Sequence, residues 1–216
     1  QAYKERPAHK DPSMRIIALF ISLALSACAL TATQTPQALQ SLPAGAYQLE
    51  KPHGSLTFRV KHLGLSYYTA RFADFDATLD FDPKAPAASH VKAIINPLSV
   101  RTDNAADPGW DKRIGQDLMK GADFPQIVFE STSIETTGPF TGKVTGNLTL
   151  AGVSKPVTFD VTYNGAMASA ALYAGRPAVG FSAHGTLNRS AFGLTRYAEF
   201  VGDEVEFIIE AEFTRH

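Results

Sequence analysis

Cysteine occurs once among the 216 residues, at position 28, which excludes a disulfide framework within the chain and a metal site built from several thiolates. Neither sign of charge is in excess, since 20 Lys and Arg stand against 21 Asp and Glu for a formal net charge of −1. Without a basic surplus, we expect no nucleic-acid partner. The 44% of hydrophobic and 19% of charged residues exclude a disordered, collagen-like or coiled-coil protein.

A long apolar run near the start of the chain is also lacking. The run at 16–25 is too short to span a hydrocarbon core of roughly 30 Å, which takes about 20 helical residues. It follows Arg15 and precedes small residues, a pattern typical of a secretory signal. We therefore interpret residues 14–27 as a signal peptide, and residues 1–13 as an upstream or leader segment outside the fold.

The single cysteine stands directly behind that run, and residues 25–28 (LSAC) resemble the bacterial lipobox. In that interpretation the chain is cut before Cys28 and the thiol carries a lipid that anchors the protein to a membrane. Ala29 behind the cysteine then favours the outer membrane, with the protein in the periplasm. The alternative is a cut by the ordinary signal peptidase, with Cys28 incidental. Residues 28–46 have no periodicity and predict a flexible tether ahead of a folded domain at 47–216.

Strict alternation of apolar and polar residues dominates the rest of the chain. It is clearest at 75–81 and 157–163, and at 205–213 it has one exception, Ile208. Because successive side chains of a strand point to opposite faces, these segments predict strands with one dry face and one wet face. Further strands are predicted at 47–50, 56–62, 91–95, 127–131, 144–150 and 179–187.

About nine amphipathic strands with almost no helix between them predict an all-β fold, either a sandwich or an antiparallel up-and-down barrel. An outer-membrane barrel fits less well, because the runs are short and no aromatic girdle recurs at the strand ends. One helix is predicted in a long connection, at 110–120, where Trp110, Ile114 and Leu118 share a face and Gly121 provides a stop. Such a helix could close one end of a barrel.

Motifs for catalysis or metal binding are scarce. Ser190 lacks the Gly-x-Ser-x-Gly context of a nucleophile elbow. His53, His62 and His184 are scattered and lack the spacing of a zinc site. We expect no catalytic residues, no metal and no enzymatic activity. An enzyme that acts on a lipid held inside the fold would show a perturbed titratable group among the interior aromatic residues.

Several segments, in order along the chain, resemble the YceI-like family: 53–64, 70–72, 124–132, 146–157, 188–194 and 202–205. The resemblance implies a periplasmic, lipocalin-like β-barrel that binds polyisoprenoid lipids. One region departs from the family pattern. Residues 112–124 read KRIGQDLMKGADF, with Gln116 where the family has a histidine, so head-group preference does not carry over.

With the resemblance, the inward aromatic and aliphatic side chains become candidates for the walls of a ligand cavity. A barrel of about eight strands has room for packed side chains or for one elongated ligand. The candidate lining residues are Phe58, Val60, Phe75, Leu79, Phe81, Phe129, Leu148, Phe159, Val161, Phe181, Phe192 and Phe207. The alternative is a filled core in an envelope interaction or stress module that acts through its surface.

Polar side chains near the expected strand ends are candidates for a head-group rim: His62, Arg71, Arg101 and Arg189. Each fits a solvated edge or a structural hydrogen bond equally well, and Arg189 could anchor a turn. The expected ligand is a polyisoprenoid or a quinone-like lipid, carried or stored without any other cofactor. The expected partners are that lipid and a membrane reached through Cys28, and a homodimer stays open.

Overall fold

The computed structural model describes residues 32–215, and these form an antiparallel sheet of eleven strands. The strands are β1 (Gly45–Leu49), β2 (Ser55–His62), β3 (Ser66–Phe72), β4 (Phe75–Phe81), β5 (His90–Ile95), β6 (Val100–Arg101), β7 (Ile127–Thr136), β8 (Thr141–Leu150), β9 (Val153–Ala170), β10 (Arg176–Asn188) and β11 (Val201–Arg215). Each of the nine predicted strands is present, so the all-β prediction is confirmed.

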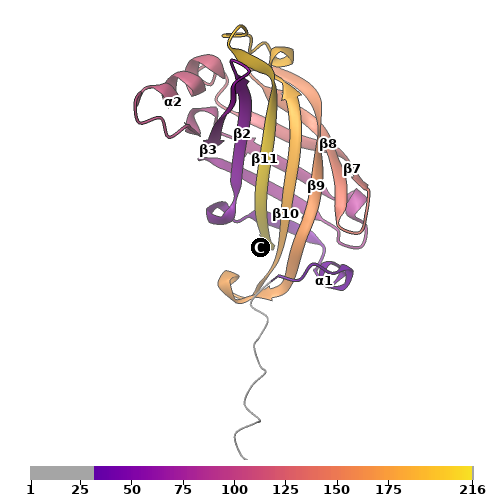
Figure 1. Ribbon diagram of the computed structural model, residues 1–216. Coiled ribbons are helices and arrows are strands. Elements are labelled where there is room, and N and C mark those ends of the chain that lie inside the picture. The colour runs from indigo at the N-terminus through magenta and orange to yellow at the C-terminus, as the bar shows by residue number, and fades with distance from the viewer. Residues whose placement is uncertain (1–31, 216) are drawn as a thin grey trace, which may run out of the picture. The chain divides into compact units, whose positions relative to one another are not determined.

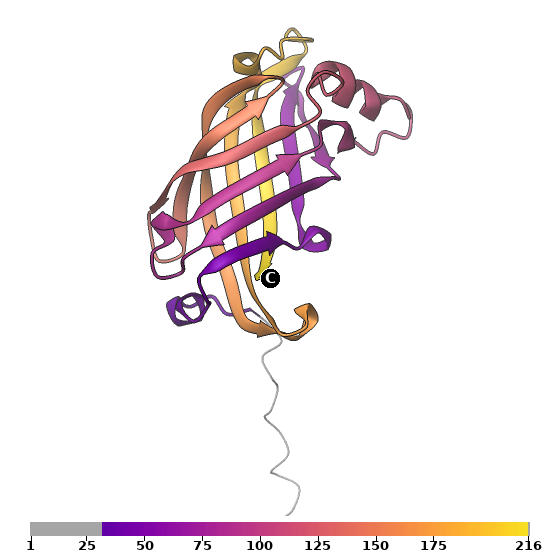
Figure 2. The same ribbon diagram turned by 180° about the vertical axis from the view of Figure 1, so that it is seen from behind.

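Eight of these strands close into a barrel, in the order β1, β4, β5, β7, β8, β9, β10 and β11 (Figures 1 and 2). The ring closes where β1 pairs with β11, for example Leu49 with Phe213. Strand β2 pairs with the rest of the edge of β11 that β1 uses. Strands β3 and β6 follow β2 in the sheet and lie outside the eight-stranded ring. The upper end of the barrel in Figure 1 holds the β2–β3 and β10–β11 connections, and the lower end holds the β7–β8 and β9–β10 connections.

The alternation read from the sequence corresponds to the inner and outer faces of this barrel. In β4, Ala77, Leu79 and Phe81 are buried, whereas Thr78 and Asp80 between them are exposed. Because one face of every strand points inward, the interior is lined almost wholly by apolar side chains. Bulges between β7 and β8 and between β9 and β10 bend these long strands around the ring.

Strand β3 was not among the predicted strands. Its inner face carries Tyr68, Ala70 and Phe72, with polar residues between them, but Tyr67 ahead of them puts an aromatic residue on the outer face, so the alternation covers only residues 68–72. Strand β6 has only two residues, too few for any periodicity. Both strands lie beside β2 at the point where the sheet leaves the ring.

The predicted helix at 110–120 is present as α2 (Trp110–Arg113), which continues directly as a turn of π-helix, η4 (Ile114–Leu118). Gly121 follows it and donates its backbone N–H to the carbonyl of Gly115 at 2.9 Å. The other helical pieces are short: α1 (Pro36–Gln40), η1 (Lys51–His53), η2 (Pro86–Ala88), η3 (Pro97–Ser99), η5 (Ala171–Tyr173) and η6 (Arg189–Phe192).

The described part of the predicted tether, residues 32–46, is packed on the barrel, which corrects the expectation of a flexible linker. The backbone of Thr33 exchanges two hydrogen bonds of 3.1 Å with Ala166, and residues 36–40 form α1. Leu42 is only 3% exposed and packs into the same apolar cluster as Tyr47 and Tyr163. These contacts form because apolar side chains cover the lower end of the barrel, which a pattern search along the chain does not detect.

Other expectations about the N-terminal region fall outside the described residues. These are the upstream segment at 1–13, the signal peptide at 14–27 and the lipidation of Cys28. Within residues 32–215, no helix is both long enough and apolar enough to cross a membrane.

Candidate functional site: the cavity inside the barrel

The barrel encloses a cavity of about 680 Å³. Every strand of the eight-stranded ring contributes to its wall, together with β2, β3 and the α2–η4 helix. The lining reaches from the upper end, at His62 and Tyr197, to the lower end, at Leu39 and Phe140. The volume lies within the range of roughly 300–1,000 Å³ that is common for small-molecule sites. A filled core is therefore wrong for this protein, and the alternative that relied on one loses its structural basis.

All the predicted lining residues except Phe192 border the cavity. Phe192 lies in η6, not on a strand, and its side chain is buried in the apolar cluster that contains Leu187 and Val205. The correction follows from local geometry, because a residue in a helical turn does not keep the inward direction of the strand before it.

Edge-to-face and tilted ring contacts hold the aromatic walls in place. Phe129 and Phe159 are T-shaped with centroids 5.3 Å apart, and Phe58 contacts Phe72 with centroids 5.2 Å apart. Lower in the barrel, Phe81 and Phe181 make a second T-shaped pair at 5.9 Å. These rings pack against one another along the wall, and all of them border the cavity.

The α2–η4 helix supplies part of the cavity wall that the lining prediction did not include. Trp110, Ile114 and Leu118, which share one helical face, all border the cavity, as does Met119. The indole of Trp110 is held to β3 by a hydrogen bond to the hydroxyl of Tyr68. The i, i+4 spacing of these apolar residues in the sequence indicated a helix. That this helical face lines the cavity is shown only by the folded barrel.

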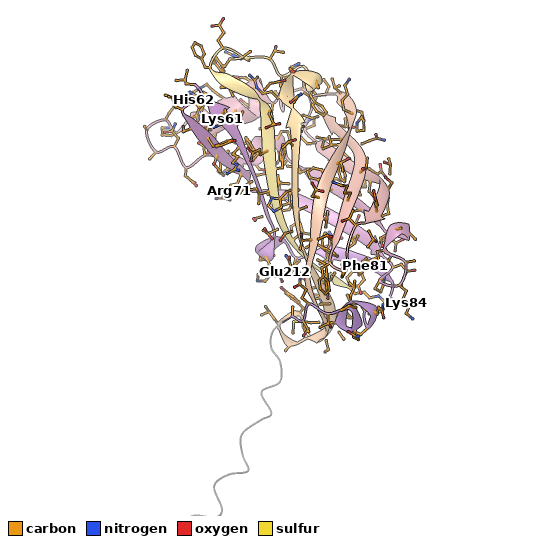
Figure 3. The ribbon with its side chains drawn as sticks, turned by 45° about the vertical axis from the view of Figure 1, so that its right-hand side comes forward. Lys61, His62, Arg71, Phe81, Lys84 and Glu212 are labelled. Carbon is orange, nitrogen blue, oxygen red and sulfur yellow. The ribbon has the colours of Figure 1, made fainter. Side chains whose placement is uncertain are left out.

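The four predicted rim residues divide into two pairs. His62 is exposed at the upper end (Figure 3). It borders the cavity, and Arg189 borders it as well. Arg71 and Arg101 face each other across the β3–β6 pair and do not line the cavity. Arg71 instead borders a separate pocket of about 220 Å³ on the side of the barrel. The prediction of a four-residue rim is therefore wrong for Arg71 and Arg101.

The guanidinium of Arg189 is occupied by the backbone. It donates hydrogen bonds to the carbonyls of Gly202 at 2.9 Å, Val201 at 2.8 Å and Arg196 at 2.9 Å, and also to that of Leu194. These bonds fix the connection between β10 and β11. Arg189 is thus a structural anchor for this loop, the role that the sequence left open for it.

The loop that Arg189 anchors brings further residues to the upper end of the cavity. Leu194, Arg196, Tyr197 and Phe200 all border it, and none was predicted. No periodicity marks these residues because they follow the last turn of η6 in irregular backbone. The fold of the loop, not a pattern in the sequence, places them at the opening.

Ionisable groups at the cavity lie near its two ends. At the lower end, burial raises the pKa of Tyr163, whose hydroxyl donates a hydrogen bond to the carbonyl of Thr33 at 3.0 Å. Asp203 does not border the cavity but lies in β11 beside its upper end. It accepts hydrogen bonds from the backbone N–H and the hydroxyl of Ser190, and these bonds lower the pKa of the Asp203 carboxyl. Ser190 and Asp203 therefore tie η6 to the start of β11.

A metal centre has no ready-made ligand set in the described part of the chain. Across residues 32–215, no three His, Cys, Asp or Glu side chains are grouped so that they could hold an ion. The middle of the cavity wall consists of aromatic and aliphatic side chains, such as Phe58, Phe129 and Phe207. The arrangement offers a binding space for an apolar molecule, with polar groups only near the openings.

Comparison with known proteins agrees with this geometry. The family description "YceI-like domain" matches residues 47–213. A UPF0312 protein of Yersinia pestis (strain Pestoides F) is 38% identical over 175 residues, which cover 80% of this chain and 88% of that protein. The crystal structure of the Campylobacter jejuni YCEI protein is 30% identical, with a TM-score of 0.62 over 72% of this chain and 90% of that one.

A polyisoprenoid-binding domain from Saccharophagus degradans has the same fold, with a TM-score of 0.59 over 79% of this chain and 98% of that domain. Its sequence is only 13% identical. The family match covers far more than half of the chain, and it follows the strands that build the cavity. The chain belongs to the YceI-like family.

Proposed function

We propose that this protein binds a long apolar lipid, a polyisoprenoid or an isoprenoid quinone, inside the barrel and carries or stores it in the cell envelope. The observation that carries the proposal is the cavity of about 680 Å³ with its apolar wall. The polyisoprenoid-binding domain of Saccharophagus degradans, which shares the fold, supports the same ligand class.

Burial of the lipid chain supplies the free energy of binding in this proposal. Removing apolar surface from water contributes roughly 2.5 kcal/mol for every 100 Å². The rings of Phe58, Phe129 and Phe181 present such surface along the cavity. A chain of isoprene units suits this wall because it has no polar atoms that would lose hydrogen bonds to water. The mechanism is reversible burial, and it includes no chemical step.

The head group of the lipid is expected at the upper end. His62 and Arg196 are exposed there and border the cavity, and the described hydrogen bonds do not engage either side chain. Arg189 already donates hydrogen bonds to four backbone carbonyls. A phosphate or quinone oxygen would therefore meet His62 and Arg196 first.

Native mass spectrometry of the protein, produced in a bacterial periplasm and gently purified, tests the binding function. We expect an additional mass that organic extraction removes and that added isoprenoid restores. Extraction also identifies the lipid. A protein that is purified without any lipid, and stays without one after incubation with isoprenoids and quinones, contradicts the proposal.

The envelope location is a separate part of the proposal and rests on the sequence of the N-terminal region. We propose that Cys28 is acylated and holds the protein at the outer membrane. Labelling of growing cells with a fatty acid, followed by fractionation, tests this. Label in the wild type but not in Cys28→Ser is expected, whereas an unlabelled, freely periplasmic wild type would contradict the anchor.

A further inference from the structure

Large hydrophobic side chains are exposed together at the upper end of the barrel. Leu65 is 84% exposed, Leu63 51%, Phe200 50% and Tyr197 41%. We call these four residues the rim patch. Leu63 and Leu65 lie in the β2–β3 turn, and Tyr197 and Phe200 lie in the β10–β11 connection. Single exposed hydrophobic residues are common, but a group of them at one opening indicates a surface that meets a partner.

The two loops that carry the rim patch form one connected and ordered surface. The backbone N–H of Leu63 donates to the carbonyl of Phe200 at 2.7 Å, and His62 pairs with Val201 directly below. Arg189 fixes the β10–β11 connection by donating hydrogen bonds to the backbone carbonyls within it and at the start of β11. The apolar side chains are thus presented by a fixed backbone.

Two residues of the rim patch have backbone conformations that cost free energy. Leu63 has φ 54° and Tyr197 has φ 61°, in the left-handed region that residues other than glycine rarely adopt. Such conformations gather at sites of function. Here they turn two apolar side chains toward solvent, at the point where the cavity opens.

The rim patch is continuous with the interior. Tyr197 and Phe200 belong to the patch and also border the cavity. An apolar path therefore runs from the outer surface of the patch into the barrel. A lipid that left a bilayer along this path would not have to cross open water.

Cations flank the rim patch at the end of β2 and in the β10–β11 connection. The ammonium of Lys61 lies 4.3 Å from the ring centroid of Tyr67, and the guanidinium of Arg196 lies 5.2 Å from that of Tyr197. The opposing charges are Glu199 in the same connection and the exposed Asp203 and Glu204 at the start of β11. Aromatic rings and basic side chains around an apolar centre are typical of surfaces that dock on lipid head groups and insert into the acyl boundary.

We propose that the rim patch docks the open end of the barrel on a lipid bilayer, so that the lipid exchanges directly between membrane and cavity. The proposal rests on the lipid-binding function proposed above and adds the surface through which the ligand enters. Leu172, which is 78% exposed in the β9–β10 connection at the other end, supplies a matched control position.

Site-specific quenching measures the docking itself. Leu65→Trp and Leu172→Trp are each made in the full-length protein and mixed with vesicles of phosphatidylcholine and phosphatidylglycerol that contain brominated acyl chains. The signal of the native Trp110 is subtracted with the parent protein. We expect quenching of the new indole at position 65 and not at position 172. Attachment elsewhere in the chain does not imitate this result, since the signal is local to the substituted side chain.

A second variant measures transfer. Leu63→Ser/Leu65→Ser removes two exposed side chains that do not border the cavity, so it should fold as the wild type does, which its thermal unfolding checks. We expect its uptake of isoprenoid from vesicles to fall by more than about tenfold, while uptake from a water-soluble cyclodextrin complex is unchanged. Leu172→Ser should match the wild type in both assays.

The outcomes separate the two proposals. Equal quenching at positions 65 and 172, or undiminished uptake from vesicles by Leu63→Ser/Leu65→Ser, overturns membrane docking while lipid binding stands. Binding of the patch to a protein and not to a bilayer would give the same negative result. Failure of the wild type to take up isoprenoid from either source overturns the carrier function, and the quenching result still decides whether the patch meets a membrane.

Discussion

The indole Nε1 of Trp110 donates a hydrogen bond to the hydroxyl of Tyr68 across 2.9 Å, and both side chains border the cavity. This bond joins α2 to β3 at the place where the sheet leaves the eight-stranded ring. The helix thereby becomes part of the wall, and the only tryptophan of the chain reports on the binding space.

Tyr68→Phe should free the indole of Trp110. Loss of one partly buried hydrogen bond is expected to lower the free energy of unfolding by about 1 kcal/mol. The tryptophan emission should also shift, because the indole loses a fixed partner. Urea unfolding and emission spectra measure both effects. Tyr67→Phe on the outer face of β3 should leave the emission unchanged, and an unaltered emission in Tyr68→Phe would contradict the described contact.

Ala93→Trp should fill the cavity and exclude the lipid. Ala93 borders the cavity from β5, so a large ring at this position occupies space that the ligand needs. Uptake of isoprenoid should be lost, while the protein stays folded. Thr78→Trp adds the same side chain to the outer face of the neighbouring strand and should bind lipid as the wild type does. Normal uptake by Ala93→Trp would show that the ligand lies elsewhere.

Leu42→Ala tests whether residues 32–46 belong to the folded unit. Leu42 is buried with Tyr47 and Phe81, so its truncation leaves a void at the lower end of the barrel. We expect the free energy of unfolding to fall by about 2–5 kcal/mol. Denaturant unfolding measures the change, with the exposed Gln40→Ala as the control. If Leu42→Ala lowered the free energy of unfolding no more than Gln40→Ala does, the prediction of a flexible tether would stand.

Asp203 should make the β10–β11 connection sensitive to acid. Hydrogen bonds from Ser190, chiefly, hold the pKa of the Asp203 carboxyl below its ordinary value of 3.8. A carboxyl with a lowered pKa in the folded state contributes stability at pH values above 3.8, and this contribution is lost as the pH falls through the lowered pKa.

The comparison of wild type with Asp203→Asn isolates this effect. Unfolding is followed from about pH 6 down to about pH 2, and the difference in stability between the two proteins should shrink toward the acid end. Glu206, whose pKa is also lowered, by Tyr67 and Arg59, is present in both proteins and cancels. A difference that stays constant with pH would contradict the assignment.

Much of the fold could be predicted because the barrel repeats one simple pattern. Alternation identifies strands such as 75–81 without further information, since one face of each must be dry. Strand β3 was not predicted because its alternation is limited to residues 68–72, ahead of which Tyr67 places an aromatic ring on the outer face. There it lies beneath the cations of Arg59 and Lys61.

Whether the interior is hollow or filled could not be predicted in the same way. The inward phenylalanines Phe58, Phe129 and Phe207 suit a packed core and a cavity wall equally well. The radius of the ring, which depends on strand number and stagger, decides between them. The rim prediction for Arg71 and Arg101 was wrong because these residues pair with each other between β3 and β6. Strand β6 has only two residues, so no pattern in the sequence indicates it.

Closure of the barrel by β1 and β11 has a consequence for how the chain folds. Leu49 meets Phe213, and Thr214 donates a hydrogen bond to Glu50 across 164 positions of sequence. Contacts between such distant segments form slowly, because a long loop must first lose its freedom. Until β11 arrives, β1 and β10 each lack a neighbour that closes the ring, and the apolar inner faces are open to other chains. The final strand is therefore the step that ends the exposure of this protein to aggregation.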